Sequence, residues 1–403
     1  MKMQSQTFIK TYVPKEFEKQ FLIKKAPDIT VNDTVYIENG IVCVDVSHTS
    51  GVVYDDKGIL CESSITYRFD GCMAIPSFND KCDFIDEQVI FMGCGYIFNH
   101  FGHFLLEGLS RLYPMLDKKY KNKKLVFVVN KNTKKLPSYV LDILGGLGVK
   151  QENIILIYKT TRFAGVYVPP QASVITKYIS NIMNTVLDAV AKNLENKNLK
   201  TYKKIYLSRS KMNDGRTFGE SVIEKIFANN GYQIVWPETL SLQDQITLVK
   251  NSEIIAGIAG TALHLSLFMK PGGTVIQIKR NTLNSDNAEI QNDICNFKKL
   301  NFVYIAGSIE KRPTKHFTDV PQLVGITKFM KQFFDENKFK YTSQDVVCDK
   351  YILRQYKKQL CKYKIKRTYT KFISVIARII SLFGITKYGR QNIRKSIMNF
   401  LHV

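Results

Sequence analysis

Near the amino terminus, apolar and polar residues alternate in three short segments that Gly and Asp residues separate. Alternation with a period of two is typical of strands with one buried face, and Gly and Asp favour tight turns between them. The segments are Thr34–Glu38, Gly40–Val46 and Gly58–Cys61. We therefore predict a small antiparallel meander, within a β-rich segment over residues 1–87 that packs on the domain that follows.

From about residue 88, short apolar runs alternate with stretches of helical periodicity. Alternating strands and helices predict an α/β fold with a parallel sheet covered on both faces. The pattern places strands at 88–93, 124–129 and 153–157, and helices at 99–116, 138–147 and 173–194. The last of these is a long amphipathic helix. The polar residues after it predict a domain boundary, so that the first domain spans 88–197.

The second half of the chain repeats the alternation, with Pro271-Gly272-Gly273 as a sharp turn before its last strand. Strands are expected at 204–208, 232–235, 253–257 and 274–278, and helices at 219–229, 241–250 and 261–269. These elements predict a second doubly wound domain over residues 198–345. Two α/β halves joined by a helix predict a ligand cleft between them, at the carboxyl ends of their strands.

Composition narrows the class of protein. Of the 403 residues, 45% are hydrophobic and 23% are charged, which is typical of a globular protein and excludes a disordered or collagen-like chain. The eight cysteines form no C-x-x-C pair of the kind found in zinc sites, and the sequence has no signal-peptide pattern. It also has no apolar run of about 18 residues. We therefore expect free thiols, a cytoplasmic location and no membrane-spanning helix.

The formal net charge of +23 is concentrated at the carboxyl terminus. Residues 351–403 carry 13 of the 58 Lys and Arg and none of the 35 Asp and Glu, which leaves 45 − 35 = +10 for the first 350 residues. One helical face of this tail carries Phe372, Val375, Ile376, Ile379 and Phe383. An apolar face beside Lys and Arg predicts that residues 346–403 bind an anionic membrane surface, on the inner face of the cell membrane. A helix folded back on the protein ranks second, and nucleic-acid binding ranks last because no recognition motif accompanies the charge.

The densest group of polar residues lies at the start of the helix expected over 99–116. His103, Glu107 and Arg111 are spaced i, i+4 and i+8, so they share one helical face. Glu107 can accept a hydrogen bond from His103 and leave the other ring nitrogen as a base, while Arg111 offers a cation to an anion or to Glu107. A histidine at a helix start beside a surface ion pair explains the same residues without chemistry. A zinc site that includes His100 is a third interpretation, although no further ligand follows at a familiar spacing.

A basic loop follows the strand expected at 204–208. A loop at the end of a strand is where doubly wound domains hold phosphates, and the cations and hydroxyls of Ser208, Arg209, Ser210 and Arg216 suit a diphosphate. A solvated basic loop is the alternative, since the chain is rich in Lys. We favour the phosphate interpretation.

Small residues follow the strand expected at 253–257 and lead to Gly260, Thr261 and His264 at a helix start. There a ligand can approach the backbone, and the amides attract negative charge, although glycine often serves close packing alone. The sequence also lacks Asp-x-Asp, the paired carboxylates that hold a metal–diphosphate in many sugar transferases. Basic residues and helix starts must then stabilise a leaving diphosphate.

Taken in order, these segments resemble glycosyltransferase family 61, a family that includes bacterial capsular and lipopolysaccharide enzymes. The resemblance rests on His103, Phe104, Glu107, Leu109 and Arg111, and on three later segments, 206–209, 238–245 and 257–268. It covers residues from about 88 to 280. Two departures stand out. Leu265 occupies the usual position of an Asn, and Ala259–Leu263 stands where many relatives have H-G-A-G-L.

The resemblance implies a GT-B-like architecture, in which two Rossmann-like domains face a cleft, and transfer of a sugar from a nucleotide sugar with inversion and without metal or other cofactor. It implies a base beside the acceptor, which is a glycan or a lipid-linked molecule. His103 and Glu107 are the two candidates, supported by Asn99, His100 and Arg111. The donor side would be formed by Ser208, Arg209, Arg216, Glu238 at the ribose or base, Gly260, Thr261 and His264.

Two other functions compete with this one. A non-catalytic protein of the same fold would act as a scaffold in a membrane polysaccharide-assembly complex. A polysaccharide phosphotransferase would use the same basic loops with a divalent metal.

Overall fold

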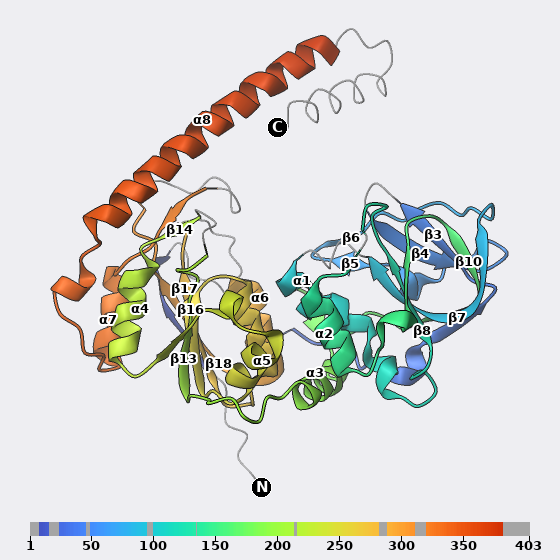
Figure 1. The fold of residues 1–403 in the computed structure, drawn as a ribbon, viewed down its shortest axis with the longest axis horizontal. Coiled ribbons are helices and arrows are strands. Elements are labelled where there is room, and N and C mark those ends of the chain that lie inside the picture. Colours follow the sequence, from blue (N-terminus) through green and yellow to red (C-terminus); the bar gives the residue numbers. More distant parts are fainter. Residues whose placement is uncertain are drawn as a thin grey trace. The chain divides into compact units, whose positions relative to one another are not determined.

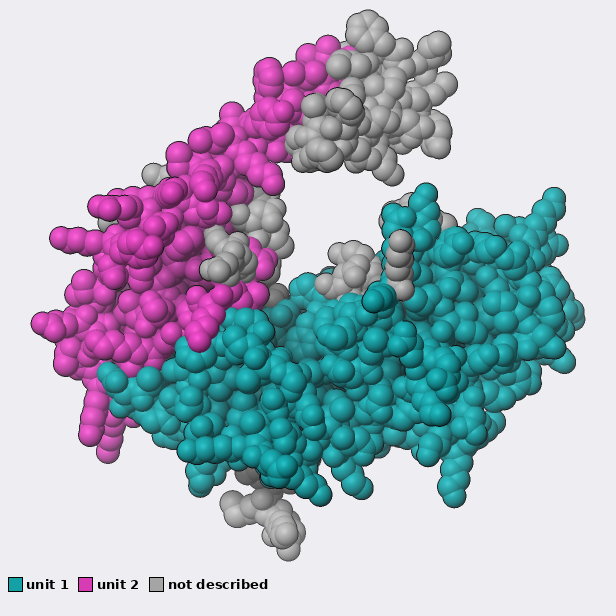
Figure 2. Space-filling view, in the orientation of Figure 1, with its two compact units in different colours: residues 1–208, 227–279, 285–306 teal, residues 209–226, 280–284, 307–403 magenta. Residues whose placement is uncertain are grey.

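The structure is a computed structural model of the chain that describes residues 8–15, 24–45, 49–94, 100–133, 135–212, 216–281, 288–310 and 320–381 (Figure 1). It is an α/β protein with one mixed and one fully parallel main sheet. The chain divides into two compact units (Figure 2). Unit 1 comprises residues 1–208, 227–279 and 285–306, and unit 2 comprises 209–226, 280–284 and 307–403. Asn99 and Phe383, both singled out by the sequence pattern, lie outside the described residues.

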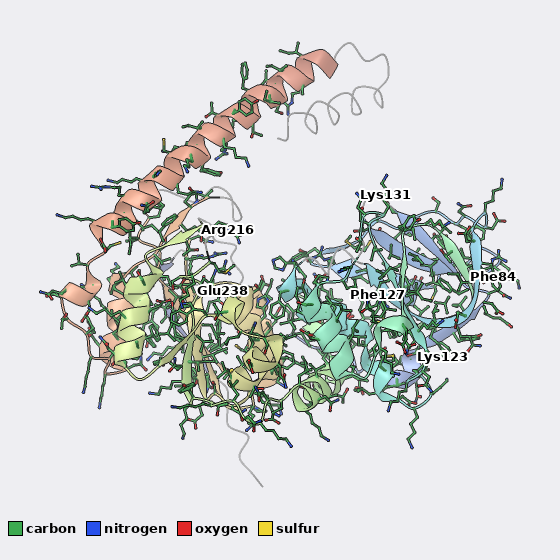
Figure 3. All side chains as sticks on the ribbon, viewed as in Figure 1. Phe84, Lys123, Phe127, Lys131, Arg216 and Glu238 are labelled. Carbon is green, nitrogen blue, oxygen red and sulfur yellow. The ribbon has the colours of Figure 1, made fainter. Side chains whose placement is uncertain are left out.

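The mixed sheet of unit 1 is centred on the parallel strands β7 (Asp83–Cys94), β8 (Lys124–Val128) and β9 (Ile154–Ile157), which confirm the three strands expected there. β10 (Thr161–Val168), which the sequence analysis missed, runs parallel to β7 on its other side. Buried side chains from these strands, among them Val89, Val126 and Phe163, form one continuous core. Phe127 of β8, which is labelled in Figure 3, is also buried.

The amino-terminal meander is a part of this same sheet. β2 (Val35–Glu38) and β3 (Ile41–Asp45) confirm the first two expected strands, but both pair antiparallel with β10. The third strand was wrongly placed at 58–61. β4 (Ser50–Tyr54) pairs with β3 instead, and all five of its residues are buried. Leu60 makes only an isolated bridge to Tyr54.

The parallel sheet of unit 1 has the strand order β1-β18-β17-β16-β13-β15. β13 (Lys204–Leu207), β15 (Gln233–Val235), β16 (Ile254–Ile258) and β17 (Thr274–Lys279) confirm the four strands expected in the second half. Two strands were not expected, β1 (Ile9–Tyr12) and β18 (Asn301–Ala306), which extend the sheet beyond β17. α5 (Leu242–Lys250) confirms the expected helix, whereas residues 261–269 form the 3₁₀ helix η9 (Thr261–Phe268) rather than an α-helix. α6 (Ala288–Lys298) contacts both η9 and β18.

The long helix expected over 173–194 is wrong in its first part. β11 (Ser173–Val174) and β12 (Tyr178–Ile179) form a short hairpin there, and α3 begins only at Ile182 and ends at Asn193. Thr176 has a left-handed φ of 61°, which a continuous α-helix does not allow. The polar residues after α3 contact α5, where Asn196 Nδ2 donates to Asp244 at 2.8 Å.

Unit 2 contains the small parallel pair β14 (Thr217–Phe218) and β19 (Gln322–Leu323), the helix α7 (Lys328–Glu336) and the 32-residue helix α8 (Lys350–Ser381), drawn in orange-red in Figure 1. The ring of Tyr356 on α8 packs edge-on against Phe218 of β14, with centroids 5.8 Å apart. α4 (Glu220–Asn229) begins in this unit and confirms the expected helix. Across the described part of the chain, no helix combines the length and apolarity needed to cross a membrane.

Candidate active site

The first polar cluster lies on α1 (Phe101–Leu106), which is much shorter than the helix expected over 99–116. The α-helix ends at Leu106 with Glu107 as its C-cap, and the chain continues as the 3₁₀ helices η5 (Gly108–Arg111) and η6 (Tyr113–Leu116). His103 and Glu107 keep their expected contact across one turn, with His103 Nδ1 2.8 Å from Glu107 Oε2. The Glu107 side chain is fully buried, whereas a quarter of the His103 side chain is exposed.

Arg68, which the sequence analysis missed, completes this cluster. It lies on β5 (Tyr67–Arg68), which forms a two-residue hairpin with β6 (Gly71–Cys72). Arg68 Nε contacts Glu107 Oε1 at 2.5 Å, and one terminal nitrogen contacts Oε2 at 3.1 Å. Nothing in the local sequence marks Arg68, because it precedes Glu107 by 39 residues and the fold alone brings the two together.

These contacts determine the tautomer of His103. A carboxylate held by a bidentate guanidinium is ionised and can only accept hydrogen bonds. His103 Nδ1 lies 2.8 Å from Glu107 and must therefore carry the proton that the carboxylate accepts. A terminal nitrogen of Arg68 also lies 3.2 Å from Nδ1, but a guanidinium has no acceptor and cannot take this proton. The lone pair of the neutral ring is then on Nε2.

Arg111 does not join this cluster as the helical spacing suggested. Because the chain turns into η5 after Glu107, the Arg111 side chain is buried among backbone carbonyls. It donates to Ser63 O at 2.6 Å, to Ile65 O at 3.0 Å and to Pro169 O. Burial lowers the pKa of Arg111 to about 10, so it stays charged at neutral pH. Its contacts hold together the segments that flank the site.

Within unit 1, the start of α1 packs against η9, which follows β16. A methyl group on Gly102 would lie 2.6 Å from Thr261 Cγ2 and 2.7 Å from His264 Nδ1, so only glycine fits at this contact. The first and third polar clusters of the sequence therefore lie side by side in space. Within the first cluster, the rings of His100 and His103 lie 4.6 Å apart between centroids and are tilted by 53° to each other.

His264 is only 3% exposed, and among the described residues neither of its ring nitrogens has a hydrogen-bond partner of standard geometry. Burial, followed by the neighbouring His103 and His100, lowers the pKa of His264 to about 3. A backbone hydrogen bond with Gly102 acts weakly in the opposite direction. The ring is therefore neutral at physiological pH, with one donor and one acceptor. A neutral and buried imidazole beside the start of α1 is well suited to bind a polar group of a ligand.

The remaining predicted donor residues are distributed over both units. In unit 1, Ser208 is buried at the end of β13, where its amide donates to Val235 O, and Glu238 is exposed in η8 (Pro237–Thr239) (Figure 3). In unit 2, the Arg209 amide donates to both carboxylate oxygens of the buried Glu220 at 3.2 Å. Arg216 (labelled in Figure 3) lies just before β14, and its carbonyl accepts from Gln322. Their roles in donor binding stay predictions.

The described residues contain no group of three or more His, Cys, Asp or Glu side chains placed to hold a metal ion. In a comparison with family models, residues 101–276 match the model described as glycosyltransferase 61. The match begins at α1, includes the His103–Glu107 pair and His264, and ends in β17. No curated protein matches the chain significantly.

Proposed function

Because residues 101–276 belong to the glycosyltransferase 61 family, we propose that this protein moves a sugar from a nucleotide sugar to a glycan or lipid-linked acceptor in surface polysaccharide biosynthesis. The observation that carries the proposal is the contact between His103 and Glu107 beside the buried His264. It supplies a general base of defined tautomer next to a buried, neutral imidazole, within the segment that matches the family.

His103 is the base in this proposal, and Glu107 is a positioning residue. Glu107 is fully buried, with one oxygen held by Arg68 and the other shared between Arg68 and His103, so it does not reach a substrate. His103 is partly exposed and presents Nε2. When Nε2 accepts a proton, the positive ring is stabilised by the Glu107 carboxylate at 2.8 Å.

The reaction then balances as a single displacement. The acceptor hydroxyl attacks the anomeric carbon and gives its proton to His103 Nε2. The bond between the anomeric carbon and the diphosphate oxygen breaks, and the diphosphate leaves with the bonding electrons from the opposite face, which inverts the configuration. The turn at Gly260 and Thr261, with the neutral His264, is the part of the donor site that lies next to this base in unit 1.

Three further features belong to the proposal. We propose a GT-B-like arrangement of two Rossmann-like halves, which the fully parallel sheet of the second half supports. We propose transfer without a metal, since the sequence lacks Asp-x-Asp and offers Arg209 and Arg216 for the leaving diphosphate. We also propose that the protein works at the inner face of the cell membrane, which the basic tail supports.

A panel of nucleotides and nucleotide sugars, screened by thermal shift in EDTA, tests the proposal first. A bound ligand at about 100 times its dissociation constant adds about 2.7 kcal/mol to the free energy of unfolding. The nucleotide sugar that stabilises the protein is then used in a turnover assay. His103→Ala should lower kcat by about 10²–10⁴-fold while nucleotide binding is retained. Full turnover in His103→Ala contradicts the assignment of the base, and no shift with any nucleotide favours the scaffold.

A further inference from the structure

A cavity of about 590 Å³ lies in unit 2, between α8 and the strand β19. One wall comes from about four turns of α8, from Tyr356 to Lys371. The other comes from Val320–Gln322 together with Arg280, Ser308 and Glu310. All of these residues belong to unit 2, and the family match, which ends at residue 276, does not include them. The proposed transfer reaction therefore does not account for this cavity.

Basic side chains form a large part of the cavity lining. Among the described residues, four cations line it, Arg280, Lys364, Arg367 and Lys371, against the one carboxylate of Glu310. Arg280 is 7% exposed and donates to Thr217 Oγ1 at 3.3 Å, so its guanidinium is held in place. An excess of three positive charges around a pocket of this size favours an anionic group with several oxygens, such as a phosphate.

Both walls of the cavity also contribute apolar side chains. Tyr356 is 6% exposed and is held by its ring contact with Phe218 of β14. Leu360, Val320 and Pro321 continue this surface. A free phosphate ion has no apolar surface to bury against these side chains, whereas a phosphate ester of an apolar molecule would bury its apolar part there.

Beside the cavity, α8 exposes an apolar stripe along its length. Ile365, Phe372 and Ile379 follow each other every seven residues and are 65%, 62% and 55% exposed, and Tyr369 and Val375 lie between them. Side chains seven residues apart lie on the same face of an α-helix. Residues 350–381 contain no Asp or Glu, so no negative charge on the helix opposes an anionic surface.

The basic residues follow the same spacing along one edge of this stripe. Lys364, Lys371 and Arg378 each precede a member of the apolar series by one position, and the first two also line the cavity. The cavity therefore opens next to the apolar stripe, and the same lysines border both. A helix with an apolar face and a basic edge lies in the interface of an anionic membrane at the depth of the lipid phosphates.

We propose that this cavity binds the phosphate of an anionic glycerophospholipid while α8 lies in the membrane interface. Arg280, Lys364, Arg367 and Lys371 contact the phosphate, and Tyr356 and Leu360 cover the apolar part of the molecule next to it. The apolar stripe enters the acyl region and brings the cavity to the height of the head groups. This goes beyond the proposed transfer reaction, and its test measures binding rather than turnover, so either can fail without the other.

The first experiment measures binding of dihexanoyl phosphatidylglycerol, kept below its micelle concentration, to the full-length protein by calorimetry. Lys364→Gln combined with Lys371→Gln removes two cations from the cavity. Lys357→Gln combined with Lys366→Gln removes the same charge from the same helix outside it. We expect the cavity pair to weaken binding at least about tenfold and the control pair to change it less than about twofold. Circular dichroism checks that both variants keep their helices.

Two comparisons show whether the calorimetric signal comes from the lipid phosphate in the cavity: binding of inorganic phosphate, and the losses in the two variant pairs. Inorganic phosphate that binds as tightly as the lipid would mean a site for free phosphate, and equal losses in the two pairs would mean a general charge effect. Either result overturns the proposal.

A flotation assay tests the stripe with vesicles of phosphatidylcholine and of an equal mixture of phosphatidylcholine and phosphatidylglycerol. Phe372→Ser combined with Ile379→Ser should lower binding to the mixed vesicles at least about tenfold while the soluble lipid still binds. Unchanged flotation of this variant would refute the role of α8, as would equal binding to both kinds of vesicle.

Discussion

The contact between Arg68 and Glu107 is a feature of the site that the tertiary structure reveals and the sequence does not, and it makes a quantitative prediction. The Glu107 side chain is fully buried, the Arg68 side chain is 15% exposed, and their atoms meet at 2.5 and 3.1 Å. At a charge separation of roughly 4 Å and an effective dielectric constant near 20, the attraction is about 4 kcal/mol. Glu107→Gln keeps the size of the side chain but leaves the guanidinium without its counter-charge. We expect the free energy of unfolding to fall by about 3 kcal/mol.

A double-mutant cycle isolates this pair. Arg68→Gln alone leaves the Glu107 carboxylate buried without its cation and should also cost about 3 kcal/mol. The double variant should cost less than the sum, with a coupling energy of about 2 kcal/mol measured by urea unfolding at pH 7. Glu87→Gln is the matched control, because Glu87 pairs with Lys124 on the surface and its loss should cost less than about 1 kcal/mol.

The same variant tests the chemistry. In Glu107→Gln the amide can donate to His103 Nδ1, which moves the ring proton to Nε2 and removes the base. We expect kcat to fall about 10²-fold or more with nucleotide binding retained. Two results would refute the reasoning: additive stability losses within about 0.5 kcal/mol, which would mean that Arg68 and Glu107 do not interact, or wild-type turnover in Glu107→Gln.

Three further predictions follow from buried residues of unit 1. Gly102→Ala should lower the free energy of unfolding, measured by urea titration, by about 1–3 kcal/mol and reduce turnover, because the new methyl group meets Thr261 and His264. Gly145→Ala in α2 (Ser138–Gly146) is the control. Its methyl group would meet no atom within 4 Å, so it should be neutral or stabilising in the same titration. The pKa of His264 is about 3 in the folded protein, whereas an unfolded histidine has a pKa near 6.5. Below about pH 6.5 the unfolded state therefore binds a proton that the folded state does not, and the free energy of unfolding falls by about 2 kcal/mol between pH 6.5 and 5. His264→Gln should flatten this pH dependence. Arg111→Met should cost about 3 kcal/mol or more in thermal unfolding, because two buried carbonyl groups and one partly buried carbonyl group lose their donor. A loss below about 1 kcal/mol would contradict the assigned contacts.

The sequence alone predicted the elements whose signals are local. Short apolar runs bounded by Gly, Pro or polar residues identified β7, β8 and β9 and four strands of the parallel sheet, and the amphipathic periodicity of 241–250 identified α5. The contact between His103 and Glu107 was also predictable, because one helical turn separates them and α1 is long enough to preserve it. The family resemblance, which rests on the order of short motifs, was confirmed by the match over 101–276.

Elements decided by distant contacts were missed. β10 lies between β7 and β3 only because strands from three parts of the chain converge there, and β18 is placed between β17 and β1, the latter nearly 300 residues away. The helix expected over 173–194 follows an amphipathic pattern. Its first residues nevertheless form a hairpin whose Ser180 amide bonds to Ala172 O. Tertiary hydrogen bonds override a helical pattern where the chain must turn.

The candidate active site, like the fold, was predicted in its local contacts but not in its long-range ones. Helical spacing put His103, Glu107 and Arg111 on one face, but it assumed an unbroken helix, and the change to η5 after Glu107 directs Arg111 to carbonyls instead. The cation that pairs with Glu107 comes from a hairpin 39 residues before Glu107. His264 lies 161 residues after His103 in the sequence (264 − 103). Local periodicity therefore determined which residues can act, because it depends on neighbours in the chain. Only the packing of α1 against β5 and η9 decided which of them meet, because charge pairing and burial depend on neighbours in space.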